Sequence, residues 1–214
     1  MNPIKLVVFD LDGTLNRTEL YAVPAHKKAL AERGIFDKTA EDIIATFGAR
    51  YLDCGLALIG TNDLKEMEKY FSQEAAYEQE FIQQYAGFYD GADKMLDRLH
   101  ELGFRTAVCS NASERYIRMV LGRLGLLDKI DEIQPLLPGL IKDQTLGLLL
   151  ERAQPEAAVM VGDRYYDKQA AKANGLPFIG CLHGFCPAEV ADGDRTVDHL
   201  SQVPEAVIEL IGRD

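Results

Sequence analysis

Short apolar runs rich in β-branched residues alternate along this chain with stretches of helical periodicity. Such alternation is typical of a parallel sheet covered by helices, because each parallel crossover requires a connecting segment, usually a helix. The predicted strands are residues 6–10, 105–109, 157–162 and 177–181, with weaker candidates at 131–135 and 196–198. The predicted helices that connect them are residues 91–102, 113–124, 144–153 and 167–174, and a last helix that starts at Pro204. The pattern predicts an α/β fold.

The connection between the first and second predicted strands is unusually long. It holds roughly ninety residues, where a crossover needs only about a dozen. Its predicted helices are residues 18–33, with Pro24 as a kink or a late start, residues 39–47 and residues 62–85. We expect residues 16–82 to form a small helical domain, and residues 1–15 plus 83–214 to form the α/β core domain. A chain of 214 residues can bury enough surface for both.

The charge of the chain limits its partners. With 23 Lys and Arg against 34 Asp and Glu, the formal net charge is −11. A protein this acidic repels phosphate backbones and anionic lipid, so we expect neither a nucleic-acid nor a membrane partner. A small anionic substrate remains compatible with a site that concentrates positive charge locally.

The N-terminal segment favours a cytoplasmic location, and the cysteines are compatible with it. The first apolar run is interrupted at Asp10, too early for a signal peptide or a spanning helix. The cysteines at positions 54, 109, 181 and 186 contain no C-x-x-C pair. We expect them to be buried, reduced thiols, as free cysteines often are.

The first candidate site is Asp10-Leu11-Asp12-Gly13-Thr14, at the end of the first predicted strand. Residues i and i+2 of an extended chain face the same side, so the two carboxylates converge beyond the carboxyl edge of the sheet. Open α/β sheets bind their ligands at that edge. Two acids so close repel each other unless a cation lies between them, and Mg²⁺ prefers oxygen ligands. A plain turn would also explain this segment, since Asp-Gly is a common turn dipeptide.

A second apolar strand also ends in an acid, at Asp163. If this strand lies beside the first, Asp163 is opposite Asp10 and completes an oxygen-rich metal site. Asp167 follows four residues later, where a helix begins. It is either an acid that supports the site from behind the metal ligands, or a helix N-terminal residue favoured by the helix dipole.

Such a group of carboxylates needs positive and neutral donors before it can hold a phosphate. Ser110 and Asn111 follow the second predicted strand and precede a helix, so the hydroxyl and nearby backbone N–H groups can receive phosphate oxygens. Lys142 stands between this point and the Asp163 strand and can provide a fixed ammonium. Alternatively, Ser110 is a helix-capping residue and Lys142 an ordinary surface lysine.

Together these four segments resemble the motifs of the haloacid dehalogenase-like hydrolase superfamily, in their order and spacing. The segments are FDLDGTL with Asp10 and Asp12, CSN with Ser110, Lys142, and VGDRYYD with Asp163 and Asp167. An insertion between the first two motifs is that superfamily's type 1 helical cap, so the resemblance covers the whole chain. It implies a Rossmann-like parallel-sheet core with a helical cap.

The resemblance also implies roles for these residues. In that superfamily, the residue at the position of Asp10 is the nucleophile that forms an aspartyl phosphate, and the one at Asp12 is the general acid and base. Mg²⁺ is held by the side chains at Asp10 and Asp163 and by the backbone carbonyl at Asp12. Members without the second acid tend to cleave carbon–halogen or carbon–phosphorus bonds. The acid at Asp12 therefore implies a phosphatase that acts on phosphate esters or anhydrides.

The stretch MVGDRYYDKQAAKANGLPFIGCLHGF more narrowly resembles phosphoglycolate phosphatase-like and 5′-nucleotidase-like members. Two segments depart from the superfamily pattern. Lys142 is followed by Asp143, where proline is frequent, and His183-Gly184-Phe185-Cys186 replaces the usual aromatic-Gly-Tyr-Gly.

Within the insertion, Arg50 follows a helix end and Gly48. In similar capped enzymes, including β-phosphoglucomutase, this loop touches the part of the substrate that does not react. Arg50 could therefore grip a carboxylate or a second phosphate, or it is a solvated arginine. His183 is the one histidine near the expected site, either as a ligand contact or as a structural residue.

Three functions remain open at this point. The first is a Mg²⁺-dependent phosphatase that hydrolyses a small phosphorylated metabolite, such as a phosphoglycolate-, nucleotide- or sugar-phosphate-like compound. The second is a phosphomutase, which uses the same residues but keeps water from the acyl phosphate. The third is a non-enzymatic phosphoacceptor, although such a receiver has no large insertion between its first two strands. We expect a monomer or a homodimer.

Overall fold

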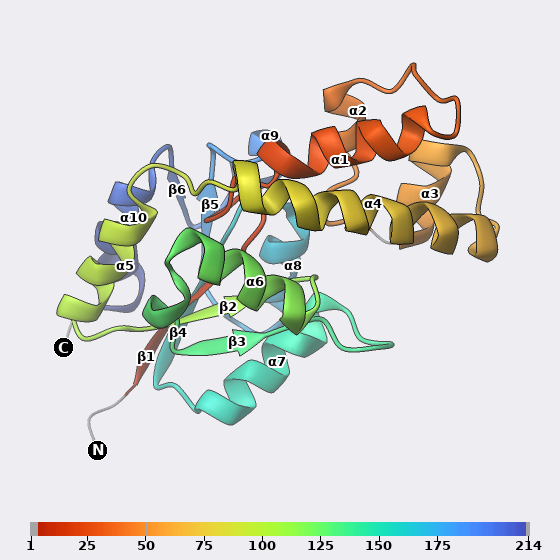
Figure 1. Ribbon diagram of the computed structural model, residues 1–214. Coiled ribbons are helices and arrows are strands. Elements are labelled where there is room, and N and C mark those ends of the chain that lie inside the picture. Colours follow the sequence, from red (N-terminus) through yellow and green to blue (C-terminus); the bar gives the residue numbers. More distant parts are fainter. Residues whose placement is uncertain (1–3, 50, 213–214) are drawn as a thin grey trace. The chain divides into compact units, whose positions relative to one another are not determined.

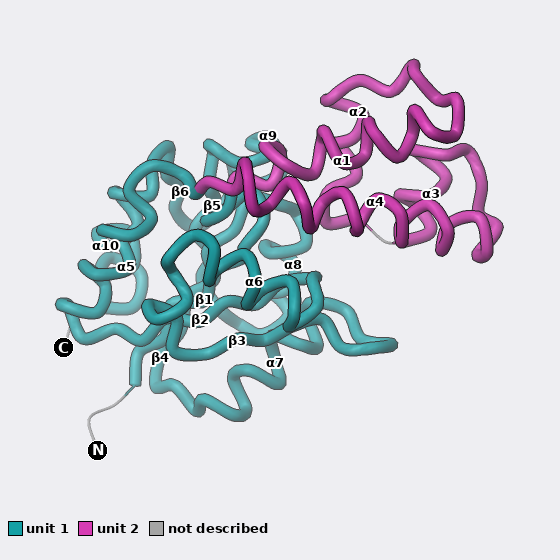
Figure 2. The backbone as a smooth tube through the Cα atoms, viewed as in Figure 1, with its two compact units in different colours: residues 1–16, 88–214 teal, residues 17–87 magenta. Residues whose placement is uncertain are grey.

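The computed structural model describes residues 4–49 and 51–212 of the chain. It contains two compact units, and Figure 2 shows them in different colours. Unit 1 comprises residues 1–16 and 88–214, and unit 2 comprises residues 17–87.

Unit 1 contains a parallel sheet whose six described strands have the order β3-β2-β1-β4-β5-β6 (Figure 1). The strands are β1 (Lys5–Phe9), β2 (Arg105–Cys109), β3 (Glu132–Gln134), β4 (Ala157–Gly162), β5 (Phe178–Cys181) and β6 (Arg195–Val197). Residues 6–9 of β1 are fully buried, as expected for a central strand covered on both faces. The strand order changes direction between β1 and β4, and ligands bind open α/β sheets beyond the strand ends at such a point.

Helices cover both faces of this sheet. The helices of unit 1 are α5 (Ala92–Glu101), α6 (Glu114–Leu124), α7 (Lys142–Ala153), α8 (Tyr165–Ala173), α9 (Pro187–Val190) and α10 (Val203–Ile211), with short 3-10 turns at Leu127–Lys129 and Leu200–Gln202. Leu6 and Val8 share one apolar cluster with residues of α7 and α8. Because alternate strand residues face opposite sides, Val7 and Phe9 face the other layer, where α5 and α10 pack on each other and on β2 and β4.

Unit 2 is helical. Its helices are α1 (Glu19–Ala31), α2 (Ala40–Ile44), α3 (Tyr51–Ile59) and α4 (Leu64–Tyr85). The long helices α1 and α4 pack against each other, and buried residues from all four helices, including Leu30, Ile43, Leu58 and Tyr70, form one apolar core. Asp63 starts α4 by accepting hydrogen bonds from the backbone N–H groups of the first helical turn.

The α/β fold with a parallel sheet core and a helical insertion is confirmed, while several predicted details differ. Helix α3 was not predicted, because Gly55 lowers the helix propensity in the middle of this short, mostly apolar segment. Pro24 lies inside α1 without ending it. The boundary expected at residue 82 falls inside α4, and unit 2 continues to Gly87.

Helix starts were also misplaced in unit 1. Helix α7 begins at Lys142 rather than at residue 144, because the Gln144 side chain accepts a hydrogen bond from the backbone N–H of Ile141. Helix α8 begins at Tyr165 rather than at residue 167, since Asp167 caps the first turn from its third position. Across residues 4–49 and 51–212, every helix is too short or too polar to cross a bilayer.

Candidate active site

The parallel strands bring the predicted site residues to one edge of the sheet. Asp10 follows β1, Ser110 follows β2 and Asp163 follows β4. In β1, Phe9 is paired with Val108 of β2 and with Val161 of β4, and the backbone N–H of Asp10 donates to the carbonyl of Val161 at 2.8 Å. The sequence expectation that the Asp163 strand lies beside the first strand is therefore confirmed.

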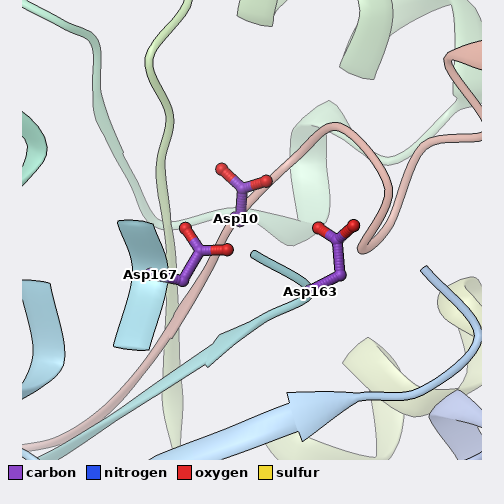
Figure 3. A group of neighbouring side chains, drawn as sticks. All are labelled: Asp10, Asp163 and Asp167. Atoms are coloured by element: carbon purple, nitrogen blue, oxygen red, sulfur yellow. The ribbon is translucent and has the colours of Figure 1, made fainter. Parts of the chain in front are cut away.

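Three buried carboxylates gather at this edge: Asp10, Asp163 and Asp167 (Figure 3). One oxygen from each lies within 4.8 Å of the others. Burial raises the pKa of Asp10 well above its ordinary value, although the Lys142 ammonium opposes this rise. Burial and the neighbouring Asp167 carboxylate raise the pKa of Asp163 to about 7. The cluster of three carboxylates therefore carries more negative charge than its surroundings compensate.

Lys142 supplies the ammonium of this cluster. It is the first residue of α7, is only 5% exposed, and its Nζ contacts the carboxylates of Asp10 and Asp167. Burial alone would lower the pKa of Lys142, but these two carboxylates raise it above its ordinary value. Lys142 is therefore a fixed cation and not a solvated surface lysine.

Asp167 makes two kinds of contact. Its Oδ1 contacts Lys142, and its Oδ2 accepts a hydrogen bond from the backbone N–H of Arg164 at 3.0 Å. The sequence left open whether Asp167 supports the site or belongs to a helix N-terminus, and its contacts are of both kinds. It caps α8 and at the same time holds Lys142.

Asp163 is held by the loops that follow β1 and β5. Thr14 Oγ1 donates to Asp163 Oδ1 at 3.1 Å, and the backbone N–H of Phe185 donates to Asp163 Oδ2 at 2.7 Å. Close approach requires glycine at two positions: a Cβ atom at Gly13, whose φ is +87°, would lie 2.4 Å from Asp163 Oδ2, and one at Gly184 would lie 2.1 Å from Asp163 Cβ. The loop of residues 183–186 departs from the superfamily pattern, but it keeps Gly184, which packs on Asp163.

Two side chains donate hydrogen bonds to one oxygen of Asp12. Its Oδ1 accepts hydrogen bonds from Asn16 Nδ2 at 2.8 Å and from the Tyr116 hydroxyl at 2.9 Å. Neither donor was singled out from the sequence. Asn16 is close enough in sequence to be suspected as a polar residue that follows the motif, whereas nothing in the sequence around Tyr116 links it to a residue 104 positions away.

The residues expected to bind phosphate lie after β2. Ser110 is buried, and its hydroxyl oxygen accepts a hydrogen bond from the backbone N–H of Ala112 at 3.2 Å. Helix α6 is capped by Ser113 rather than by Ser110. Asn111 is half-buried. The hydroxyl proton of Ser110 is not used in the bond to Ala112, so it can be donated to a ligand.

His183 contacts the loop that follows β1. Its Nε2 lies 3.2 Å from the backbone carbonyl of Thr14, and its ring centroid is 4.5 Å from that of Tyr89. Burial lowers its pKa. His183 therefore packs within unit 1 against the loop that follows β1. Arg50 lies outside the described residues.

The donor set fits a hard divalent cation. Asp10 and Asp163 offer carboxylate oxygens at the ends of adjacent strands, and the cluster as a whole has three carboxylates against the Lys142 ammonium. Mg²⁺ is bound by such oxygen ligands, and its charge would oppose the effects of burial and of the Asp167 carboxylate, which raise the pKa of Asp163. The arrangement suits chemistry on an anionic group such as phosphate.

Comparison with known proteins gives consistent matches. Residues 7–181 match a family described as haloacid dehalogenase-like hydrolase. A Rhodospirillum rubrum protein named phosphoglycolate phosphatase is 32% identical over 202 residues, which cover 87% of this chain and 83% of the relative. Pyrophosphatase PpaX of Anoxybacillus flavithermus is 26% identical over 186 residues, which cover 83% of each chain. A haloacid dehalogenase-like family hydrolase from Streptococcus pneumoniae has the same fold, with a TM-score of 0.85 at 19% identity over 96% of this chain and 99% of that one.

Proposed function

Because this chain belongs to the haloacid dehalogenase-like hydrolase family, we propose that it is a Mg²⁺-dependent phosphatase that hydrolyses a small phosphate monoester through an aspartyl phosphate on Asp10. Family membership confirms the superfamily expected from the four motifs and the expectation of a hydrolytic enzyme. The observation that carries the proposal is the contact of the buried Asp10 carboxylate with Lys142, at the strand end that lies beside Asp163.

Asp10 is the proposed nucleophile. Its carboxylate attacks phosphorus and displaces the leaving oxygen. Because the carboxylate and the phosphate are both negatively charged, the attack needs compensating positive charge. The Lys142 ammonium is in contact with Asp10 and supplies part of this positive charge. Mg²⁺, held by the Asp10 and Asp163 side chains and the Asp12 backbone carbonyl, would supply the rest when bound.

Asp12 is the proposed general acid and base. It gives a proton to the departing alkoxide in the first step, and it takes a proton from the water that hydrolyses the acyl phosphate in the second. One residue can perform both transfers because the first leaves it ionised and the second restores its proton.

Ser110, Asn111 and Lys142 are the proposed phosphate ligands. Ser110 can donate its hydroxyl proton to a phosphate oxygen, and Lys142 carries the charge that balances the transferred group. Asp167 keeps Lys142 in place through their contact. Nothing in this set selects a particular alcohol, and the relatives named phosphoglycolate phosphatase and pyrophosphatase act on different compounds. The proposed substrate class is therefore a small phosphorylated metabolite.

The test is hydrolysis of p-nitrophenyl phosphate and of a panel of phosphorylated metabolites with Mg²⁺ and with EDTA. We expect inorganic phosphate to be released only with Mg²⁺, and Asp10→Asn to lose at least about a hundredfold in kcat, because an amide is a poor nucleophile. Asp10→Asn should unfold at the same temperature as the wild type or slightly higher, since it lacks one repelling carboxylate. Phosphate release that is unaffected by EDTA and by Asp10→Asn would refute the proposal, and transfer of phosphate between sugars without its release would indicate a mutase.

A further inference from the structure

Asp12 receives two hydrogen bonds from different parts of unit 1. Asn16 Nδ2 and the Tyr116 hydroxyl both donate to the same oxygen, Oδ1, at 2.8 and 2.9 Å. Asn16 is in the loop that follows β1, and Tyr116 is in the first turn of α6. A carboxylate oxygen offers about two acceptor directions, so these two donors fill both directions of Oδ1.

Both donors are fixed by their own surroundings. Asn16 is fully buried, its backbone N–H donates to the carbonyl of Leu11 at 2.9 Å, and its carbonyl accepts from the N–H of Gly13 at 2.9 Å. The backbone N–H of Tyr116 donates to the capping hydroxyl of Ser113 at 3.3 Å, which ties Tyr116 to the start of α6. Rigid donors restrict the rotation of the carboxyl group that they hold.

We propose that Tyr116 and Asn16 are positioning residues that fix the Asp12 carboxyl group and confine its proton transfers to Oδ2. This inference rests on the proposed function of Asp12. In the first step, the bond from phosphorus to the leaving oxygen breaks as Asp10 attacks, and the proton on Asp12 Oδ2 moves to that oxygen. In the second step, a water oxygen bonds to phosphorus, its proton moves to Oδ2, and the bond from phosphorus to Asp10 breaks. Oδ1 keeps its two hydrogen bonds throughout.

The test is Tyr116→Phe, which removes one donor and keeps the ring. With p-nitrophenyl phosphate, the leaving group needs no proton, so kcat/KM should stay within about twofold of the wild type. The hydrolysis of the phosphoenzyme still needs Asp12, so kcat should fall by about tenfold, the effect of one lost hydrogen bond to a charged group. With an alkyl phosphate, both kcat and kcat/KM should fall. Tyr165→Phe, in an exposed tyrosine of α8, is the matched control and should leave all constants unchanged.

A double-mutant cycle shows whether Tyr116 acts through Asp12. When Tyr116→Phe is added to Asp12→Ala, the rate of phosphoenzyme hydrolysis should change by less than about twofold, because the group that it positions is absent. An equal loss in both backgrounds, a kcat/KM loss of the same size on both substrates, or no loss in Tyr116→Phe would overturn the inference. Wild-type activity of Asp12→Ala would instead refute the proposed role of Asp12 itself. Thermal unfolding of each variant verifies that it is folded.

Discussion

At the scale of single residues, the site depends on how closely the loops approach Asp163. The backbone N–H of Phe185 donates to one of its oxygens at 2.7 Å, and Thr14 donates to the other at 3.1 Å. These bonds require the chain at Gly184 to lie against the Asp163 side chain, where there is no room for a Cβ atom. Glycine at this position therefore serves the orientation of the carboxylate that we propose as a Mg²⁺ ligand.

Gly184→Ala should disturb this carboxylate. An ideal Cβ atom at residue 184 would lie 2.1 Å from Asp163 Cβ, so either the loop or Asp163 must move. We expect at least about a tenfold loss in kcat/KM and a higher Mg²⁺ concentration for half-maximal activity, because a misplaced ligand weakens metal binding.

Gly122→Ala is the control for this substitution. A Cβ atom there meets no other atom within 4 Å, and residue 122 lies inside α6, so alanine should stabilise the protein by up to about 1 kcal/mol. Normal Mg²⁺ activation of Gly184→Ala would show that the close packing has no bearing on the site.

At the scale of elements, the packing of α1 on α4 buries an unusual polar group. His26 of α1 lies 2.7 Å from the Tyr70 hydroxyl through Nδ1 and 3.7 Å from Glu74 Oε1 through Nε2. Glu74 is only 6% exposed. Burial raises the pKa of Glu74 to about 8 and lowers that of His26 to about 4. Both groups are therefore mainly neutral in the folded protein near pH 7.

This burial makes stability depend on pH. A carboxyl group whose pKa is raised on folding stabilises the protein fully below its unfolded pKa of 4.5, and this contribution is lost as the pH rises through about 8. From pH 6.5 to 8, the free energy of unfolding should fall by at most about 1.4 kcal/mol per pH unit on account of Glu74. At pH 6.5, His26 with its ordinary pKa of 6.5 is half protonated in the unfolded state and neutral in the folded state, so it offsets a smaller part of this fall at the lower end of the window.

Glu74→Gln should remove this dependence, so its stability relative to the wild type should increase from pH 6.5 to 8. Chemical denaturation at pH 6.5 and at pH 8 measures the free energy of unfolding of each variant. Glu80→Gln, on the exposed face of α4, is the control. A stability difference between Glu74→Gln and the wild type that is the same at both pH values would contradict the buried, protonated state of Glu74.

The same elements show what the sequence can predict. The ends of β1 and β4 were predictable, because an apolar β-branched run followed by an acid marks a buried strand with a polar edge. Helix α3 was not, since Gly55 interrupts its pattern, and only the structure shows that Met67 packs where a Cβ atom at residue 55 would lie. The local sequence pattern therefore predicts most strands and helices. A residue that breaks the pattern, such as Gly55, is explained only by its neighbours in the folded structure.

At the scale of the whole molecule, the candidate site depends on contacts between distant segments. Asp10, Lys142 and Asp163 were predicted together because parallel strands end at one edge and the motifs have a known order. The hydrogen bond between Tyr116 and Asp12 spans 104 residues and has no periodic signal in the sequence. A protein with a net charge of −11 thus buries an ammonium among carboxylates at one sheet edge.

Rapid mixing of Asp12→Ala with p-nitrophenyl phosphate and Mg²⁺ should reveal the aspartyl phosphate on Asp10. The substitution keeps the backbone carbonyl proposed to bind the metal, and the leaving group needs no proton. The first step should proceed and hydrolysis of the intermediate should stall. We predict a burst of nitrophenolate close to one per enzyme, followed by a slow steady state, and acid-quenched protein that carries phosphate on Asp10 in peptide mass spectra. Absence of both the burst and the phosphorylated peptide, in a variant that still binds Mg²⁺, would rule out Asp10 as the nucleophile.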